Sequence, residues 1–414
     1  MKDNRSYVFY FPYKLIGGVS NLFLKCFHIL NSNYQDVYLV DFKDGYMAKN
    51  QQDKFKDKLI DVEKLKKFNN KSTFIFQSIA PWNIKNYKSF NNEDNVLFWN
   101  LHPYNLFPYL LTDRDSFFKK YISRLIKPFA YFRKKKIRNF VKLMIENKSI
   151  YFMDDENKIK KEEFLELKIS DEFILPLFVD QSNLRISSKE INTISKIGYL
   201  GRLVDFKVFP LIQILNRFEK LEKGYQFYII GNGPMEDQLK KITKNFKFLK
   251  VIFHDEIDIK NNDSILYDID LFFSMGLSLV EIASRGIPVI PMDYSYKNVD
   301  DLIKLNYLRD IENFNLAEEL LNVNQFEEIC TLKKRITDLE LNYSAYCKES
   351  KDWAEKYFSA SNWTNKFLKI MSKSTMKIKD IRKNNFHKPD LISYVFKSLV
   401  ISFKKNETSY FNNL

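Results

Sequence analysis

The residues best suited to chemistry lie in one window of the chain, between Gly198 and Gly286, which holds seven of its ten glycines. Glycine is kept where a backbone must turn tightly or approach a ligand closely. Within this window Arg202 and Lys207 follow the apolar stretch 196–200. A guanidinium and an ammonium on one loop can hold a diphosphate, the first through paired hydrogen bonds and the second as a point charge. Two solvated surface cations are the alternative for this pair taken alone.

A Gly-x-Gly turn follows the next apolar stretch, residues 226–230. Gly231 and Gly233 precede Pro234, which we expect at the first position of a helix whose free N–H groups point at a ligand. A dinucleotide-binding fold would place a third glycine where Glu236 stands. The turn therefore argues against an NAD or FAD enzyme.

A third loop contains Gly276, Ser278 and Glu281. We expect Ser278 to cap the following helix while the backbone amides there face a phosphate. Glu281 lies one turn further on, where a carboxylate can accept both hydroxyls of a ribose. A solvated helix glutamate, or the second half of a Ser-x-x-Glu capping box, is the alternative for Glu281.

These loops must be positioned by a regular framework, and the sequence predicts one. Short apolar runs alternate with helical stretches along the chain, which is typical of parallel sheets covered by helices. Strands are expected at residues 7–11, 37–41, 73–78, 96–101, 150–153 and 172–176, and again at 196–200, 226–230, 251–254, 271–273 and 288–290. Helices are expected at residues 209–223, 234–246, 280–285, 300–305 and 343–371. The sequence therefore predicts an α/β protein of two Rossmann-like, doubly wound halves.

In their order and spacing, the motifs between residues 196 and 292 resemble the C-terminal, nucleotide-sugar-binding domain of GT-B glycosyltransferases, especially those of family 4. The resemblance implies two Rossmann-like domains facing a cleft. By the same resemblance Arg202 and Lys207 would hold the diphosphate of the donor, Gly231 and Gly233 would line the nucleotide cleft, and Glu281 would bind the ribose. Gly276 and Ser278 would belong to the same donor site.

Two departures from the family pattern limit what the resemblance implies. Many members carry a first glutamate eight residues before the ribose-binding one, and here that position is Phe273. The segment from Met275 to Glu281 instead resembles a Met-Gly-Thr-Ser variant of some surface-polysaccharide transferases, with Leu277 in place of the threonine. Retention or inversion at the anomeric carbon therefore cannot be inferred. In addition, Val208 stands where a glycine usually follows the lysine.

The first half of the chain carries fewer motifs. Gly17 and Gly18 follow the first strand and resemble the Gly-Gly loop that lets the backbone of these enzymes approach the donor phosphate. His102 ends a predicted strand, where similar enzymes often place a histidine near the sugar, either as a base or as a hydrogen-bond partner. A structural histidine is the alternative. Asp41 and Asp44 are further carboxylates that no motif favours.

The resemblance also implies a division of the chain. It places an acceptor-binding domain at residues 1–178 and a donor-binding domain at 190–342. Helices at 343–373 would return to the first domain, and residues 374–414 would form a basic amphipathic tail.

No Asp-x-Asp with the surroundings of a metal-dependent transferase stands out, and we expect neither a metal nor a cofactor. The acidic pairs 154–155 and 300–301 are expected in surface loops. The donor is expected to be a UDP-sugar or GDP-sugar, with cations and helix dipoles replacing the metal at the leaving diphosphate.

The net charge of +14 suggests an anionic partner. Residues 116–145 hold no acid but ten cations, and seven aromatic residues are interleaved with them. This stretch is expected to bind an anionic membrane surface, with the amphipathic segment 391–405 as a second contact. Solvated basic faces are the alternative. Nucleic acid is not expected as a partner, because no RNP-like or helix-turn-helix signature accompanies the charge.

We expect the protein to stay in the cytoplasm, and the resemblance together with the basic stretch implies a place on the inner face of the membrane. No leader precedes the first strand, and no apolar run reaches the roughly 18 to 20 residues that span a bilayer. Cys26, Cys330 and Cys347 are too few and too scattered for a disulfide framework or a zinc site, and we expect buried thiols.

The function predicted from the sequence is metal-independent transfer of a sugar from a nucleoside-diphosphate sugar to a glycan or a lipid-linked saccharide, in the synthesis of a bacterial surface polysaccharide. Two alternatives stay open. One is a nucleotide-sugar epimerase with the same fold, and the other is a non-catalytic partner subunit that keeps the fold without the activity.

Overall fold

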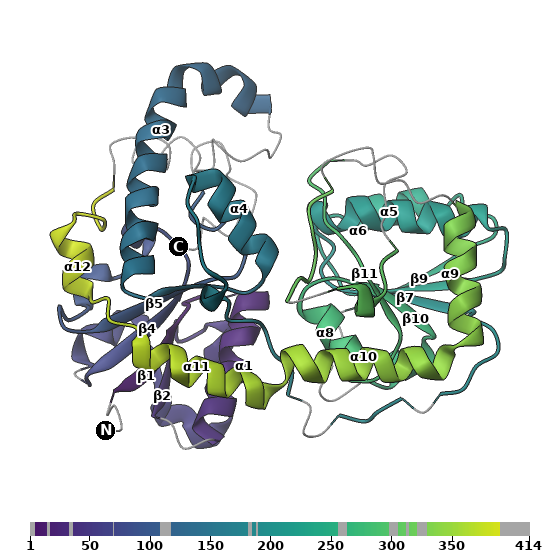
Figure 1. Cartoon of the computed structure of the whole chain (residues 1–414), viewed down its shortest axis with the longest axis horizontal. Helices are drawn as coiled ribbons and strands as arrows, with labels where there is room; N and C mark the ends of the chain where they lie inside the picture. The colour runs from purple at the N-terminus through teal and green to yellow at the C-terminus, as the bar shows by residue number, and fades with distance from the viewer. Residues whose placement is uncertain are drawn as a thin grey trace. The chain divides into compact units, whose positions relative to one another are not determined.

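The computed structural model of the chain describes residues 5–14, 17–32, 36–68, 70–107, 117–180, 184–187, 189–255, 263–297, 305–311, 314–320 and 329–389, and for residues 117–130 and 329–330 it describes the backbone alone. The chain divides into two compact units, residues 1–175 with 363–414, and residues 176–362. Each unit is built on a parallel sheet with helices on its faces (Figure 1). The predicted α/β class, with two doubly wound sheets, is confirmed.

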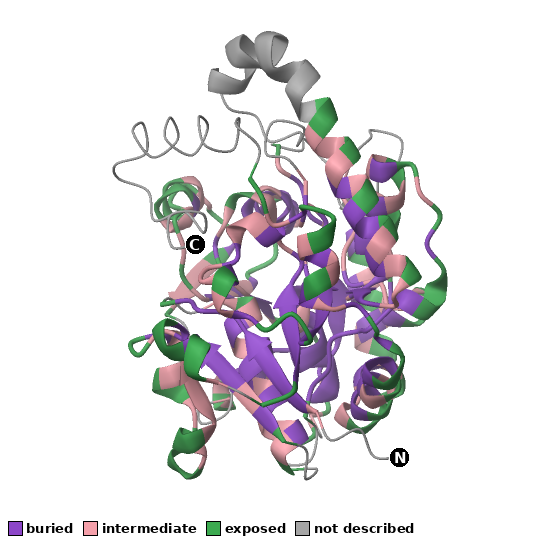
Figure 2. Ribbon diagram, turned by 90° about the vertical axis from the view of Figure 1, so that its left-hand side faces the viewer, coloured by how far each residue is buried: buried purple, intermediate pink, exposed green. Residues whose placement is uncertain are grey.

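The first unit contains a six-stranded sheet in the order β3-β2-β1-β4-β5-β6, and its pairings are parallel. Its strands are β1 (Ser6–Tyr10), β2 (Val37–Asp41), β3 (Leu59–Asp61), β4 (Ser72–Gln77), β5 (Asn95–Asn100) and β6 (Ile150–Phe152). All residues of β1, β4, β5 and β6 are buried (Figure 2). Burial on both faces explains why these strands form nearly continuous apolar runs in the sequence.

Helices cover both faces of this sheet (Figure 1), and aromatic side chains attach them to it. On one face Phe23 of α1 contacts Phe9, with ring centroids 5.1 Å apart, and stacks on Trp99. On the other face Phe140 of α3 meets Phe98 edge to face at 5.3 Å. Successive residues of one strand thus serve opposite faces. The helices before residue 176 are α1 (Gly18–Ser32), α2 (Tyr46–Asn50), α3 (Phe117–Glu146) and α4 (Asp155–Leu165), with 3-10 helices at Asp53–Lys58, Val62–Lys67, Pro81–Asn83, Tyr87–Ser89 and Asp171–Phe173.

The end of the chain completes the first unit. From residue 363 onward α11 (Ala360–Lys373) packs on the same face as α1, where Trp363 stacks on Trp99 with centroids 6.0 Å apart. Phe367 of the same helix contacts Phe9. The short helix α12 (Ile378–Lys383) follows, and the bridge between Asn95 and Lys377 ties this segment to β5.

The second unit contains a five-stranded sheet in the order β11-β10-β7-β8-β9, again with parallel pairings. Its strands are β7 (Lys196–Leu200), β8 (Gln226–Ile230), β9 (Lys250–His254), β10 (Leu271–Ser274) and β11 (Val289–Pro291). α5 and α6 cover one face, and α8 and α10 cover the other (Figure 1). The helices are α5 (Asp205–Lys220), α6 (Glu236–Thr243), α7 (Ser264–Asp268), α8 (Leu277–Ser284), α9 (Ile329–Leu341) and α10 (Tyr343–Phe358), with a 3-10 helix at Leu308–Asp310.

Two expectations about elements are wrong, and one strand was not expected. The segment 172–176 is not a strand, because Ser170 accepts a hydrogen bond from the Glu172 N–H and starts a 3-10 helix there. Pro234 is not the first residue of a helix, since it lies in a turn and α6 begins at Glu236. The edge strand β3 was not expected, because its three residues are only half-buried. Most of the expected helix 300–305 and the whole segment 391–405 lie outside the described residues.

The expectation that residues 154 and 155 form an acidic pair in a surface loop is also wrong for Asp154. This residue is buried and caps α4, and its carboxylate accepts a 2.7 Å hydrogen bond from the Asn157 backbone N–H. Burial raises the pKa of Asp154 to about 7, against the lowering effect of the hydrogen bonds from Asn157. The charge that looks exposed in the sequence is therefore a buried helix cap.

Because the folded state raises this pKa, Asp154 stabilises the protein below pH 4 and loses that contribution as pH rises through about 7. Asp154→Asn keeps a capping side chain and removes the ionisation. We expect it to raise the free energy of unfolding by roughly 2–4 kcal/mol at pH 8.5 and by much less at pH 5. Urea unfolding of both proteins at the two pH values measures this. A benefit that does not depend on pH would contradict the assignment.

Candidate functional site

The loops that the sequence singles out in the second unit leave one edge of its sheet. β7 pairs with β8 on one side and with β10 on the other, so the carboxyl ends of these three strands are neighbours. After β7 the chain adds β8 and then β9 on one side of the sheet, and afterwards it adds β10 and then β11 on the other side of β7. The point between β7 and β10 is therefore a topological switch point, where open α/β sheets bind ligands.

The loops after β7 and β8 are joined backbone to backbone. The Gly201 N–H donates to the Ile230 carbonyl at 3.0 Å, and the Leu203 N–H donates to the Asn232 carbonyl at 2.9 Å. A Cβ on Gly231, which has φ +130°, would lie 2.3 Å from the Gly201 carbonyl oxygen, and one on Gly233 would lie 2.4 Å from that of Leu203. These glycines are required because the second loop touches the first. Their contact with a nucleotide stays a prediction.

Arg202 and Lys207 both belong to this joined pair of loops. Arg202 is exposed, and its carbonyl accepts a 3.1 Å hydrogen bond from the hydroxyl of buried Tyr199. Lys207, in the first turn of α5, is half-buried, and its ammonium lies beside Gly201. Burial, and then the charge of Arg202, lowers the pKa of Lys207 to about 8. Among the described residues no carboxylate pairs with either cation, so the two repel each other and an anion between them would relieve that repulsion.

The loop after β10 presents backbone where side-chain capping was expected. α8 begins at Leu277 with Gly276 as its N-cap, and no side-chain cap hydrogen bond is formed. Gly276 has φ +63° and ψ −139°, a conformation that glycine alone adopts readily. The expectation that Ser278 caps the helix is wrong, because the N-cap is Gly276, two residues earlier, and Ser278 lies inside the first turn of the helix. The hydroxyl of Ser274, buried at the end of β10, makes no hydrogen bond with any described residue.

Glu281 lies in the second turn of the eight-residue helix α8, and it is buried. Its carboxylate accepts a 3.0 Å hydrogen bond from Nη1 of Arg285, which also donates to the Glu281 carbonyl at 2.8 Å. Asp263 lies on the other side of the guanidinium, 3.3 Å from its Nε. The structure thus places Glu281 in an internal charged group. Its binding of a ribose stays a prediction.

The glycines expected to act in the first unit begin a helix. The Gly17 N–H donates to the hydroxyl of Ser20 at 3.1 Å, and that hydroxyl donates back to the Gly17 carbonyl at 3.0 Å. Gly18 is the first residue of α1, and a Cβ there would meet nothing within 4 Å. The space beside Gly18 is open, as a close backbone approach to a ligand would need.

His102 lies in a tight turn after β5. Its Nδ1 accepts a 3.2 Å hydrogen bond from the Tyr104 N–H, and its carbonyl accepts one from the Asn105 N–H at 2.9 Å. The Asn105 carbonyl in turn accepts a hydrogen bond from the buried Lys161, whose ammonium lies 4.0 Å from the ring centroid of Phe107. Because Nδ1 accepts the hydrogen bond from Tyr104, the neutral ring carries its proton on Nε2, which can donate a hydrogen bond to a ligand but cannot take up a proton in this tautomer.

The two alternative carboxylates have structural partners. The carboxylate of buried Asp41 accepts hydrogen bonds from the backbone N–H groups of Tyr13, Phe42 and Met47, and burial raises its pKa to about 6. Asp44 forms an exposed ion pair with Lys14 at 2.8 Å. Asp41 holds the loop after β1 to the end of β2. We assign neither carboxylate to the chemistry.

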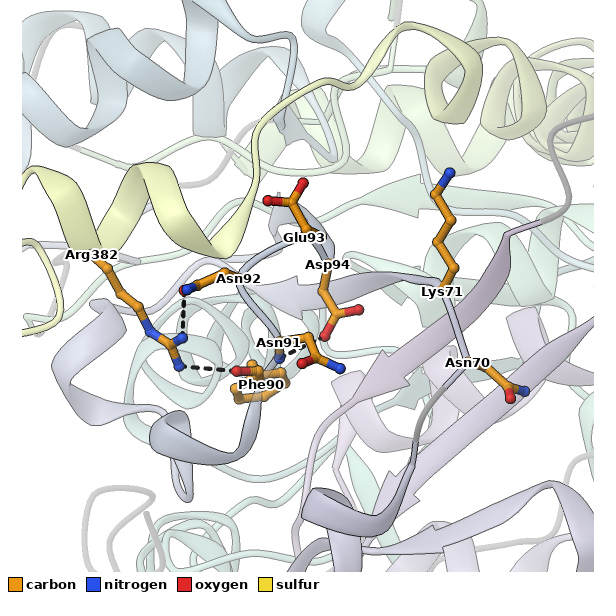
Figure 3. Close-up of a pocket in the computed structure, with 8 residues that line it drawn as sticks. All are labelled: Asn70, Lys71, Phe90, Asn91, Asn92, Glu93, Asp94 and Arg382. Atoms are coloured by element: carbon orange, nitrogen blue, oxygen red, sulfur yellow. Dashed lines mark hydrogen bonds between the residues drawn. The ribbon is translucent and has the colours of Figure 1, made fainter.

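A hollow of about 400 Å³ in the first unit lies away from these residues (Figure 3). It opens at the segments that precede β4 and β5, and so at the amino edge of the sheet. Arg382 of α12 forms one wall through hydrogen bonds to Asn92 and to the Phe90 carbonyl. It is lined by Asn70, Lys71, Phe90, Asn91, Asn92, Glu93, Asp94 and Arg382. Gly18 and His102 lie at the opposite, carboxyl edge.

Several residues at the site were not expected from the sequence. Tyr199 fixes the Arg202 loop, and Ser274 leaves an unpaired hydroxyl at a strand end. The segment after β11 also reaches α5, where the Ser295 N–H donates to the Phe206 carbonyl at 2.9 Å. Only Arg285 gave a usable signal, because a residue four positions after Glu281 on a helix must lie beside it.

Within the described ranges, no cluster of three or more His, Cys, Asp or Glu side chains is arranged to hold a metal ion. The thiols of Cys26 and Cys347 are free and buried, as expected, and the side chain of Cys330 lies outside the described residues.

Known structures resemble this fold although the sequences differ widely. Anabaena HepE in complex with UDP is 10% identical, has a TM-score of 0.57 and covers 89% of this chain and 99% of its own. A glycosyltransferase from Rickettsia africae is 14% identical, has a TM-score of 0.56 and covers 92% and 100%. WaaG, a glycosyltransferase involved in lipopolysaccharide biosynthesis, is 11% identical, has a TM-score of 0.54 and covers 89% and 100%.

A partial match is Staphylococcus aureus TarM, which is 17% identical with a TM-score of 0.47, and this chain spans 55% of its length. No family model and no curated protein sequence matches the chain. The likeness to complete structures shows that the chain has the GT-B fold. The resemblance inferred from the motifs is confirmed for the fold, and the assignment to family 4 stays a prediction.

The contact between the two loops can be tested with one methyl group. Gly233→Ala places a Cβ 2.4 Å from the Leu203 carbonyl oxygen, whereas Gly224→Ala places one in open space. We expect the first substitution to lower the free energy of unfolding by about 1–3 kcal/mol, because the loops must separate. The second should stay within about 0.5 kcal/mol of wild type. Equal urea midpoints for the two variants would show that the loops do not depend on each other.

Proposed function

We propose that this protein is a glycosyltransferase that moves a sugar from a nucleoside-diphosphate sugar to a hydroxyl of a glycan or a lipid-linked saccharide. The observation that carries the proposal is the pair Arg202 and Lys207 at the switch point of the second sheet. Two close cations that pair with no carboxylate among the described residues are suited to a diphosphate. The GT-B fold agrees with this assignment.

In the proposed reaction the acceptor hydroxyl oxygen attacks the anomeric carbon, the bond from that carbon to the diphosphate oxygen breaks, and the hydroxyl proton leaves. Negative charge then develops on the nucleoside diphosphate. Arg202, Lys207 and the backbone N–H groups at the start of α8 lie at one sheet edge and would stabilise that charge. These groups would make a metal ion unnecessary. The hydroxyl proton passes to water, and the Nε2–H of His102 would donate a hydrogen bond to a hydroxyl of the sugar.

We propose UDP as the nucleotide of the donor, ahead of GDP, because two similar structures hold it. HepE is in complex with UDP, and so is an alpha-glucosyltransferase that is 14% identical with a TM-score of 0.52. Synthesis of a bacterial surface polysaccharide is supported by WaaG and by the lipopolysaccharide outer core galactosyltransferase WaaB, which has a TM-score of 0.52.

One observation favours a non-catalytic subunit as the second candidate. Phe273, at the position of the first glutamate in many family members, is buried in the hydrophobic core against Phe218. No carboxylate can occupy that place without disrupting the core. The intact cation pair argues for the enzyme, and nucleotide binding separates the two candidates.

Arg202→Ala, Lys207→Ala and Glu281→Ala should each weaken nucleotide binding tenfold or more, since a hydrogen bond to a charged group contributes about 1.5–3 kcal/mol. Calorimetry with UDP, GDP, ADP and CMP in excess EDTA measures this and tests metal independence. Lys250→Ala is the control, because it removes an exposed lysine from the amino end of β9, at the other edge of the sheet. Unchanged affinity in all three variants would reject the site. The absence of any nucleotide binding by wild type would favour the non-catalytic subunit.

We propose further that α3 contacts an anionic membrane surface. Tyr131 and Phe132 are 67% and 69% exposed, and the exposed Lys135 lies close to them in sequence. Exposed aromatic rings beside cations suit the boundary between headgroups and water. Lys134 is partly engaged, by an ion pair with Glu166. In the described part of the chain, no helix is long and apolar enough to cross a bilayer.

The double variant Tyr131→Ser, Phe132→Ser should lose most of its co-sedimentation with vesicles that contain phosphatidylglycerol, because both exposed rings are removed from α3. Leu341→Ser is the matched control, since it removes a 79% exposed apolar side chain from the second unit. Vesicles of phosphatidylcholine alone should bind little wild-type protein. If the double variant and the control co-sediment equally, α3 is not the membrane contact.

A further inference from the structure

A buried charged group lies behind the proposed ribose contact. Arg285 lies at the C-terminal end of α8, directly before Gly286, and its side chain is only 2% exposed. Its guanidinium reaches two carboxylates: Nη1 is 3.0 Å from Oε2 of Glu281, and Nε is 3.3 Å from Oδ2 of Asp263. Nη1 also donates to the Glu281 carbonyl at 2.8 Å. Three acceptors from two segments therefore fix the guanidinium.

This arrangement determines the state of Glu281. The side chain of Glu281 is 8% exposed, and a carboxylate so poorly solvated is ionised only when a cation or several N–H groups face it. The hydrogen bond from Arg285 favours the ionised form and directs one carboxylate oxygen inward. An ionised carboxylate can accept two hydroxyl hydrogen bonds, as the vicinal hydroxyls of a ribose require, whereas a carboxylic acid has lost part of that capacity.

We propose that Arg285 is the positioning residue for Glu281, and that Asp263 holds Arg285 in that role. Arg285 touches neither donor nor acceptor in this scheme. It keeps Glu281 charged and oriented, so that the protein distinguishes a ribose from a deoxyribose. The inference rests on the proposed donor site and adds to it the residue on which recognition of the sugar ring of the nucleotide depends.

The experiment compares the affinities of UDP and GDP with those of their 2′-deoxy forms, by calorimetry on the full chain. Wild type should prefer the ribose form of the nucleotide that it binds by tenfold or more. In Arg285→Met that ratio should fall to about one, while the affinity for the 2′-deoxy form changes less than twofold. Arg285→Lys should recover part of the ratio, because an ammonium can still face Glu281.

Arg217→Met is the control for the loss of a buried arginine, since Arg217 is 3% exposed on α5. It should lower thermal stability and leave the ribose preference unchanged. If Arg285→Met does not fold, Asp263→Asn is the deciding variant, because the side chain of Asp263 is 32% exposed and its substitution disturbs the core less. This variant is expected to lower the ratio several-fold.

A ribose preference that survives in Arg285→Met or in Asp263→Asn would overturn the proposal. Wild type that binds UDP or GDP without preferring the ribose form would overturn it as well, although the donor site would stand. If wild type binds neither nucleotide, the proposed function and the proposal for Arg285 both fail.

Discussion

The second unit depends on the close approach of two backbones at the carboxyl edge of its sheet. The loop after β7 and the loop after β8 exchange hydrogen bonds through Gly201, Leu203 and Asn232, and only glycine fits at 231 and 233. This contact fixes the direction in which the chain leaves β7. The positions of Arg202 and of Lys207, in the first turn of α5, follow from it. A rigid backbone thus holds two like charges together that would otherwise separate.

Holding two cations in place has an energetic cost, to which the burial of Lys207 adds, and the packing and hydrogen bonds of the two loops offset it. The ammonium of Lys207 is half-buried next to Gly201, and the hydroxyl of Tyr199 ties down the Arg202 carbonyl. At neutral pH Lys207 is still charged, because its pKa of about 8 lies above the ambient value. A site that is strained without its ligand binds an anion more readily, since binding removes the repulsion. Arg285 solves a comparable problem differently, by pairing with two carboxylates.

Much of the framework could be predicted from the sequence, because strands buried on both faces are apolar throughout. The predicted bounds of β2, β7 and β8 match those of the structure. The half-buried β3 gave no such signal, and the acidic pair at 154–155 gave a misleading one, because a buried cap and a surface acid look alike in sequence. Spacing brought Arg202, Lys207 and Glu281 to one edge. It could not show that Asp263 reaches the same arginine as Glu281, or that Gly231 touches Gly201, since those contacts join segments that are far apart in the sequence.

The return of the chain to the first unit has a consequence for folding. Trp99 on β5 stacks on Trp363, and Phe9 on β1 contacts Phe367, although more than 250 residues lie between these partners in the sequence. During synthesis the whole of residues 176–362 must emerge before those rings can be covered. The second unit is continuous and can close its core earlier. The part of the protein that is made first is therefore finished last, and until then the part of its sheet that α11 covers is exposed to other apolar surfaces in the cell.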